Sequence, residues 1–211
     1  MYVGRIVAAG MTRAGEVAAM YRVSSRSFPN REARLVGQTV AIMPRPGFEG
    51  DLSKNPYIAY NCVRLAGDIA VVSNGSHTDP IVEKIAMGMP VRDAFGFGLL
   101  AMDYEKDSYN TPRIVAAISR KCNSGWLGII RHDALLVREF ELKPGQAFYV
   151  ATYEHNAPCS QRCDNDFAAA DAAQACSYVI RGGVFAGLEN PVTAAAVMVK
   201  GGNFEMATEV V

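Results

Sequence analysis

Short β-rich runs follow one another along most of the chain, and turn residues join neighbouring runs. Connections this short allow only antiparallel pairing, because two parallel strands need a crossover of a dozen or more residues. The pattern therefore predicts antiparallel sheets and argues against a doubly wound parallel sheet. The predicted strands are residues 2–9, 17–23, 34–43, 57–65, 69–72, 112–119, 126–132, 134–142, 146–153, 193–199 and 203–210.

Helical patterns interrupt this succession in two places. In the first, Asp79 is predicted to cap a helix that has Pro80 at its first position and ends near Gly88, and a second helix runs from Pro90 to Met102. In the second, the alanine-rich stretch Phe167–Arg181 has a polar stripe at helical spacing and is ended by glycines. The order βββββ-αα-ββββ-α-ββ predicts an α+β fold with stacked antiparallel sheets flanked by helices, formed by one domain over residues 1–211.

Size, charge and cysteine usage narrow the class of protein. A chain of 211 residues of which 50% are hydrophobic can bury a substantial core. Its 21 basic and 21 acidic residues balance, which argues against a broad surface for nucleic acid or an anionic membrane. No apolar run approaches the roughly 20 residues of a bilayer span. Five cysteines at irregular spacing fit a reducing cytoplasm better than a disulfide framework.

One stretch, Asp103–Arg113, gathers three carboxylates, two phenols, an amide and two cations. If its backbone were extended, Asp103, Glu105 and Asp107 would share one face. Crowded carboxylates raise the pKa of at least one of them, which is how a general base or acid is tuned. The alternative is a solvated connector rich in turn-forming residues.

A second polar loop, Ser24–Arg31, contains hydroxyls, an amide and two arginines. Guanidinium and hydroxyl donors match the oxygens of a phosphate, and a fixed arginine charge can polarise a carbonyl group in a closed site. The alternative is a surface turn with solvated arginines. The Pro- and Gly-rich residues 44–56 that follow the next predicted strand form a long excursion that could act as a lid.

Other motifs are weaker. Gly96–Ala101 matches a loose dinucleotide-binding pattern, but no strand precedes it. The spacing of His155, Cys159, Cys163 and Cys176 is irregular, so no metal site is predicted. His77 and His132 lie in turns and are interpreted as turn or capping residues rather than catalytic bases. No Ser-His-Asp arrangement can be assembled from the sequence.

Several longer strings of this sequence are specific enough to compare with known families: Tyr2–Arg5, Tyr21–Arg31, Asn55–Arg64, Ser73–Thr78, Asp103–Asp107 and Pro112-Arg113. Together they resemble the archaeal-type inosine monophosphate (IMP) cyclohydrolase family. The resemblance implies a four-layered αββα sandwich like that of the N-terminal-nucleophile hydrolases, without their N-terminal nucleophile, and the start Met1-Tyr2 agrees with that absence. It also implies a homotetramer.

The reaction implied by the resemblance is the last step of purine synthesis. The formamidoimidazole carboxamide ribonucleotide closes to IMP and releases water, which requires neither a metal nor a cofactor. The resemblance carries the catalytic roles onto Arg31, as an electrostatic clamp, and Glu105, as base and acid. Motif membership and hydrogen-bonding chemistry add a set of residues expected to line the nucleotide pocket: Arg26, Tyr60, Asn61, Asn74, Tyr104 and Asn110.

Two other functions stay open on the sequence. One is an amide hydrolase of the same fold that is activated by internal cleavage before Ser24, Ser25 or Cys62. The other is a purine-nucleotide-binding protein without turnover, against which the presence of both Arg31 and Glu105 argues.

Overall fold

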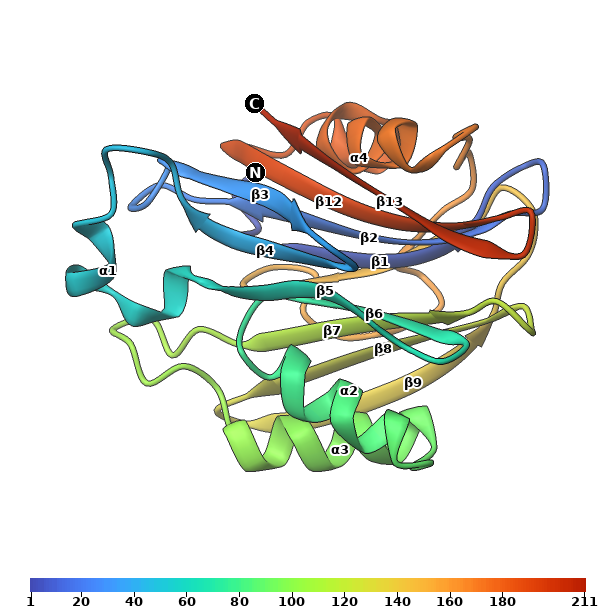
Figure 1. Ribbon diagram of the computed structural model, residues 1–211, viewed down its shortest axis with the longest axis horizontal. Coiled ribbons are helices and arrows are strands. Elements are labelled where there is room, and N and C mark those ends of the chain that lie inside the picture. Colours follow the sequence, from blue (N-terminus) through green and yellow to red (C-terminus); the bar gives the residue numbers. More distant parts are fainter.

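Thirteen strands form two antiparallel sheets in a computed structural model that describes all 211 residues (Figure 1). The first sheet has six strands in the order β11-β10-β1-β2-β12-β13, and the second has seven in the order β3-β4-β5-β6-β7-β8-β9. The strands of the first are β1 (Ile6–Met11), β2 (Val17–Ser24), β10 (Ala147–Ala151), β11 (Cys163–Asp164), β12 (Pro191–Lys200) and β13 (Asn203–Val210). Those of the second are β3 (Arg31–Val36), β4 (Thr39–Pro44), β5 (Tyr60–Ala66), β6 (Ile69–Ser73), β7 (Arg113–Ser119), β8 (Ser124–Arg131) and β9 (Ala134–Glu141).

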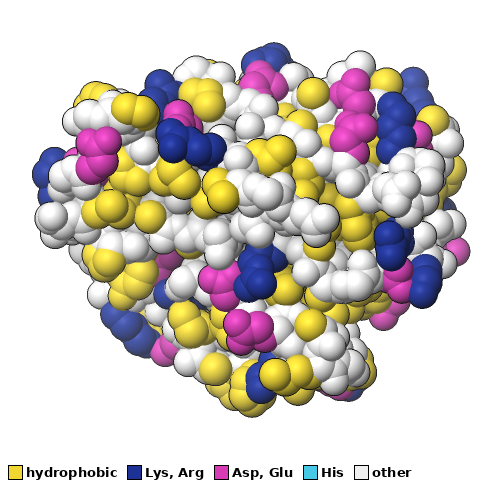
Figure 2. All heavy atoms as spheres, in the orientation of Figure 1, with side chains coloured by type: hydrophobic (Ala, Val, Ile, Leu, Met, Phe, Trp, Pro, Cys, Tyr) yellow, Lys and Arg dark blue, Asp and Glu magenta, His cyan; other side chains and the backbone are white.

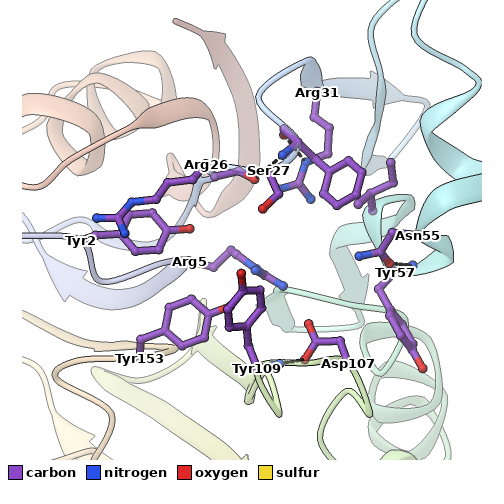
Figure 3. A pocket seen from close by; sticks show the side chains of 13 residues that line it. Tyr2, Arg5, Arg26, Ser27, Arg31, Asn55, Tyr57, Asp107, Tyr109 and Tyr153 are labelled. Atoms are coloured by element: carbon purple, nitrogen blue, oxygen red, sulfur yellow. Dashed lines mark hydrogen bonds between the residues drawn. The ribbon is translucent and has the colours of Figure 1, made fainter.

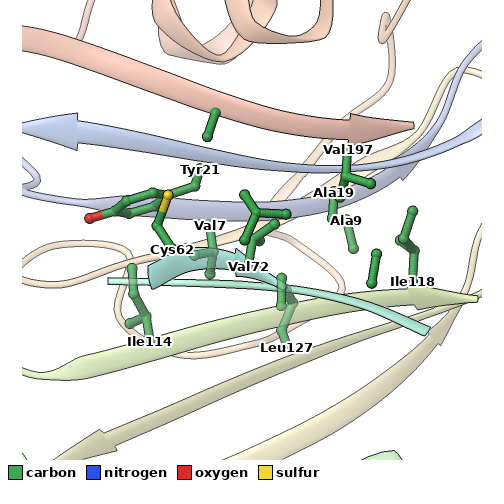
Figure 4. Close-up of a cluster of buried hydrophobic side chains, with 14 of the residues drawn as sticks. Val7, Ala9, Ala19, Tyr21, Cys62, Val72, Ile114, Ile118, Leu127 and Val197 are labelled. Carbon is green, nitrogen blue, oxygen red and sulfur yellow. The ribbon is translucent and has the colours of Figure 1, made fainter. Parts of the chain in front are cut away.

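The largest cluster of buried apolar side chains lies between the two sheets (Figure 4). Strand β1 contributes side chains to the apolar layers on both faces of its sheet. Val7 and Ala9 point into this inner cluster, whereas Ile6 and Ala8 point to the opposite face and pack under a helix. Every residue of β1 and β2 is buried, which explains why these strands are nearly continuous apolar runs.

Helices cover the outer faces of both sheets. Helix α4 (Ala172–Arg181) packs on the first sheet, and α2 (Thr78–Ala86) and α3 (Val91–Met102) pack on the second (Figure 1). The short elements are α1 (Asp51–Lys54), η1 (Pro56–Ile58) and η2 (Gly183–Phe185). The predicted α+β class with stacked antiparallel sheets is thereby confirmed. None of the helices combines the length and the apolar character that crossing a membrane requires.

The single strand predicted over 34–43 is wrong, because this segment is a hairpin. Strand β3 ends at Val36, the backbone turns through Gly37 at φ +60°, and β4 begins at Thr39. In the sequence, apolar residues occur on both sides of Gly37-Gln38. The turn is therefore easily mistaken for the middle of one continuous strand. The hairpin moves the start of the strand back to Arg31, where it pairs with Pro44.

Two predicted helix starts also differ from the structure. Helix α2 begins at Thr78, and the Asp79 carboxylate accepts hydrogen bonds from Asn61 and Arg64 instead of capping the helix. Helix α4 begins only after Asp171, whose side chain accepts from the backbone N–H of Gln174. The residues before Asp171 lie outside the helix, and the N–H of Phe167 donates to the carbonyl of Gly145 in the turn before β10.

Acidic and basic side chains are interspersed on the face of the molecule shown in Figure 2, as the balanced charge suggests. Not all basic side chains lie at the surface: Arg22 of β2 is fully buried beneath α4. Its guanidinium donates to the carbonyl oxygens of Val179, Ile180, Phe185, Leu188 and Glu189, and its Nε donates to Ser24 Oγ. Burial lowers the pKa of Arg22 to about 10. The side chain satisfies carbonyls at and beyond the helix end that would otherwise be buried without donors.

We expect Arg22→Met to lower the free energy of unfolding by roughly 3 kcal/mol or more, because several buried carbonyls lose their donors. The matched control is Arg34→Met on β3, where an exposed arginine pairs with Glu32 and the change should stay within about 1 kcal/mol. Urea denaturation of both variants measures the difference. Equal losses of stability would contradict this account of Arg22.

Candidate functional site

The ends of strands from both sheets meet at one end of the sandwich, on the left in Figure 1 near α1. Arg5 directly precedes β1, Arg31 begins β3 and Arg113 begins β7. A cavity of about 300 Å³ opens at this end, and Figure 3 shows its lining. Both polar segments singled out in the sequence contribute to it, through Ser25–Phe28 and Arg31 from one and Asp107 and Tyr109 from the other.

The carboxylate of Glu105 lies just behind the cavity wall with only 1% of its side chain exposed. Arg5, which lines the cavity, donates from Nη2 to Glu105 Oε2 at 3.3 Å, and Nη1 of Arg113 lies 3.7 Å from Oε1. Burial raises the pKa of Glu105, and the nearby guanidiniums of Arg5 and Arg113 oppose that rise. Glu105 is thus a carboxylate whose proton affinity is set by two opposing effects, as in a tuned general base.

Arg31 is the second buried charge at the cavity, and its side chain is held by the loop before it. Its Nε donates to the carbonyl of Phe28 at 3.1 Å. Burial lowers the pKa of Arg31, and the neighbouring Arg5 adds to that effect, while Tyr60, Tyr21 and Glu105 oppose it. Arg31 and Glu105 therefore belong to one electrostatic cluster, with Arg5 reaching both.

Two buried phenols lie beside these arginines, behind the cavity lining. The hydroxyls of Tyr21 on β2 and Tyr60 on β5 are 2.6 Å apart, so a hydrogen bond connects the two sheets. Burial raises the pKa of both phenols, and the pKa of Tyr21 lies well above its ordinary value. Both are neutral hydrogen-bonding groups beside the guanidiniums of Arg5 and Arg31.

Aromatic rings form the mouth of the cavity (Figure 3). The rings of Tyr2 and Tyr153 stack with centroids 5.9 Å apart, and Tyr109 meets Tyr153 edge to face. The guanidinium of Arg26 lies 4.1 Å from the centre of the Tyr2 ring and pairs with Glu189. Rings and a planar cation at a polar cavity suit a flat heterocyclic ligand that carries negative charge.

The loop from Asp103 to Arg113 does not have the extended backbone that would place its three acids on one face. Asp103 adopts φ +53° and its carboxylate pairs with Lys106. The carboxylate of Asp107 accepts from the backbone N–H and hydroxyl of Thr111, which closes the loop. Of the three acids Glu105 alone is fully buried, Asp107 lines the cavity while it holds Thr111, and Asp103 is bound to Lys106.

The residues predicted to line the pocket have different positions. Arg26 lines the cavity, whereas Tyr60 does not line it and lies buried beside Arg31. Asn61 lies on the opposite face of β5 and donates to Asp79. The buried amide of Asn74 bonds to the backbone of Pro112 and Ile114, Tyr104 packs edge to face against His132, and Asn110 is an exposed turn residue at φ +47°. None of the last four side chains lines the cavity. The amides of Asn61 and Asn74 are already engaged in the hydrogen bonds just described.

Sequence reasoning missed Arg5, Arg113 and Tyr153 as members of the site. The first two stand in strings that carry the family resemblance, Tyr2–Arg5 and Pro112-Arg113, and a signal was therefore present. Each precedes or begins a strand, which is where this fold gathers its polar side chains. Tyr153 lies outside all of these strings, and only the end of β10 places it at the cavity.

The remaining sequence motifs have structural positions of their own. Gly96–Ala101 lies inside α3, so it cannot form a phosphate-binding turn. His77 is fully buried before α2 and makes no side-chain cap. Residues 44–56 contain α1, and only Asn55 of this segment reaches the cavity, so its role as a lid stays a prediction. No group of three or more His, Cys, Asp or Glu side chains is placed to hold a metal ion.

Comparisons with known proteins agree on one family. The family model described as "IMP cyclohydrolase-like protein" matches residues 2–203. Proteins named IMP cyclohydrolase are similar over most of the chain: that of Methanosphaera stadtmanae is 49% identical over 200 residues, covering 95% of both chains. That of Methanocella arvoryzae is 56% identical over 155 residues (73% of this chain and 75% of the relative), and that of Methanocaldococcus jannaschii is 39% identical over 210 residues (99% of both). The chain belongs to the IMP cyclohydrolase-like family.

Proposed function

We propose that the protein is an IMP cyclohydrolase, which closes the formamidoimidazole carboxamide ribonucleotide to IMP with loss of water. The observation that carries the proposal is the family match over residues 2–203, together with relatives of this name at 39–56% identity. The cavity supports it independently, because it combines a buried carboxylate, buried guanidiniums and aromatic rings.

The reaction sets two chemical demands. A carboxamide nitrogen must attack a formamide carbon, and it is a weak nucleophile because its lone pair is delocalised. The enzyme therefore needs a base for an N–H proton and a cation beside the oxygen on which charge develops. Both reacting groups belong to one molecule, so holding them in the closing geometry contributes as well.

Glu105 is proposed as the base. After ring closure its protonated form returns that proton to the oxyanion, and the resulting hydroxyl leaves as water together with the proton of the formamido nitrogen, which becomes the C=N nitrogen of the ring; the carboxylate is restored. Arg5 stands between Glu105 and the cavity, and its contact with Oε2 is long for a charged pair at 3.3 Å. For direct proton transfer the guanidinium of Arg5 has to shift toward the substrate, which would also bring it to the developing oxyanion.

Arg31 is proposed as the electrostatic clamp on the formyl oxygen. Its Nε is held by the Phe28 carbonyl, which leaves the terminal nitrogens of the guanidinium to face the cavity (Figure 3). A guanidinium held in place costs little reorganisation as the oxyanion forms. Tyr60 adds a hydroxyl beside it.

The mouth of the cavity is proposed to bind the nucleotide. Arg26 stacks on Tyr2 with its guanidinium exposed, and Ser25 and Ser27 lie in the same wall. These groups suit the phosphate, while the rings of Tyr109 and Tyr153 suit the base and ribose. This proposal gives no role in nucleotide binding to four residues for which the sequence predicted one: Asn61, Asn74, Tyr104 and Asn110.

The finer features implied by the family resemblance are part of the same proposal. The two sheets between helical layers agree with an αββα sandwich like that of the N-terminal-nucleophile hydrolases, formed by one domain over residues 1–211. We expect a homotetramer, which light scattering after size-exclusion chromatography would measure. The five free cysteines support a cytoplasmic location.

We expect Glu105→Gln to lower kcat by about 10²–10⁴-fold, because an amide of the same shape cannot accept the proton. A spectroscopic ring-closure assay measures turnover, and calorimetry should show IMP binding largely retained. The control is Glu139→Gln on β9, an exposed glutamate that should keep full activity. Intact mass of the active protein separates this reading from a self-processed amide hydrolase, which would be cleaved before Ser24, Ser25 or Cys62.

Arg31→Met should lower kcat by about 10²–10³-fold, the range typical for loss of one oxyanion donor. Arg34→Met is a matched control, because it makes the same change on the same strand at an exposed position. Steady-state kinetics on both variants decides. Comparable rates for Arg31→Met and the native protein would remove Arg31 from the mechanism.

We expect kcat/KM to rise with pH on the acidic side, with a midpoint above the ordinary pKa of a glutamate side chain. The base acts in its ionised form, and burial raises the pKa of Glu105, so activity is low below that pKa and rises as pH increases through it. Measuring kcat/KM from pH 4 upward, within the range where the protein stays folded, tests the sign. A flat profile across this range would count against Glu105 as the titrating base.

A further inference from the structure

Unpaired buried polar atoms gather in one place behind the cavity. Five buried side-chain nitrogen or oxygen atoms lack a hydrogen-bond partner, and four of them belong to Arg5 (Nε), His77 (Nδ1), Glu105 (Oε1) and Arg113 (Nη1). Native proteins leave few such atoms, so a cluster of four requires an explanation. The mechanism proposed above uses Arg5 and Glu105 and leaves Arg113 and His77 without a role.

Arg113 approaches Glu105 from outside the cavity lining. It is the first residue of β7, its Nε donates to the carbonyl of Asp103 at 2.7 Å, and its side chain is 4% exposed. Nη1 lies 3.7 Å from Glu105 Oε1, which is too long for a hydrogen bond but close enough for a strong interaction between buried charges. Arg113 is absent from the cavity wall, so it has no direct path to a ligand there.

Gly75 and His77 border the guanidinium of Arg113. A Cβ atom at Gly75 would lie 2.5 Å from Arg113 Nη1 and 3.1 Å from His77 Nδ1, so only glycine leaves room for both groups. His77 Nε2 donates to the carbonyl of Ile114 at 3.0 Å. Burial, assisted by Arg113, lowers the pKa of His77 to about 3, so the imidazole is neutral and Nδ1 presents a lone pair on this side.

We propose that Arg113 is a positioning residue for Glu105, which keeps the carboxylate ionised and oriented through Nη1; its Nε is held by the Asp103 carbonyl, and the absence of a side chain at Gly75 leaves room for its guanidinium. The inference rests on the proposed role of Glu105 as the base. It assigns to the Ser73–Thr78 turn, which does not reach the cavity, the task of leaving room for the guanidinium behind the base.

The direction of the effect follows from the charges around Glu105. Arg5 from the segment before β1, Arg31 from β3 and Arg113 from β7 favour its ionised form, whereas Asp107 of its own loop opposes it. Removing or displacing Arg113 takes away one of the attractive charges, and burial then raises the pKa of Glu105 further. Activity that needs the ionised carboxylate must therefore appear at higher pH.

The test uses two variants of the full-length protein. Arg113→Met removes the charge, and Gly75→Ala keeps the charge but pushes Nη1 aside. The control is Gly96→Ala in α3, where an added Cβ meets nothing within 4 Å. We expect the acidic limb of the kcat/KM profile to move up by about one pH unit or more in both test variants and to stay in place in the control. A smaller change is expected in KM than in kcat.

A purely structural role predicts a different result, in which activity falls equally at every pH and the midpoint stays where it is. That result in a folded variant would overturn the proposal, and Gly75→Ala decides if Arg113→Met fails to fold. Titration of the Glu105 carboxyl carbon by ¹³C NMR in the same variants measures the shift without turnover. Consequently an inactive native protein would sink the proposed function, whereas an unmoved titration would sink only the role of Arg113.

Discussion

The burial of one carboxylate among guanidiniums is the interaction on which this site depends. Glu105 is almost completely removed from water, and an isolated buried carboxylate would take up a proton instead of remaining ionised. Arg5 and Arg113 come from segments more than a hundred residues apart, and each contacts a different oxygen of the carboxylate. The ion cluster therefore exists only when both sheets are in place.

The sandwich supplies that precision through its central strands. Small residues such as Ala9 and Ala19 let β1 and β2 pack closely against the second sheet, and the Tyr21–Tyr60 hydrogen bond joins the sheets at the cavity end. Strand ends are the natural place for the polar groups, because the middle of each strand is committed to two apolar layers. The polar side chains of the site thus extend from a rigid core.

Much of the fold could be predicted from local patterns, whereas the site could be predicted only in part. Alternation and turn residues define most strands, but the Gly37 hairpin is hidden because apolar residues continue on both sides of it. Glu105 and Arg31 stand in long polar strings, so their proximity to a cavity was predictable. Arg5 and Arg113 each look like an ordinary charge beside a strand, and Asn74 looks like a ligand-binding amide although the backbone of β7 uses it. Whether such a residue belongs to the site depends on which strand ends lie next to one another in the fold. A local sequence pattern does not contain that information.

The charge of the cluster also bears on what the cavity binds. Two buried guanidiniums, those of Arg31 and Arg113, and the partly exposed one of Arg5 surround the buried carboxylate of Glu105, which leaves an excess of positive charge at low dielectric. An anionic nucleotide reduces that excess, so its binding and the stability of the cluster support one another. The same excess favours the ionised form of Glu105 against its burial. One arrangement of charges therefore favours both a phosphorylated ligand and the ionised carboxylate that the proposed mechanism needs.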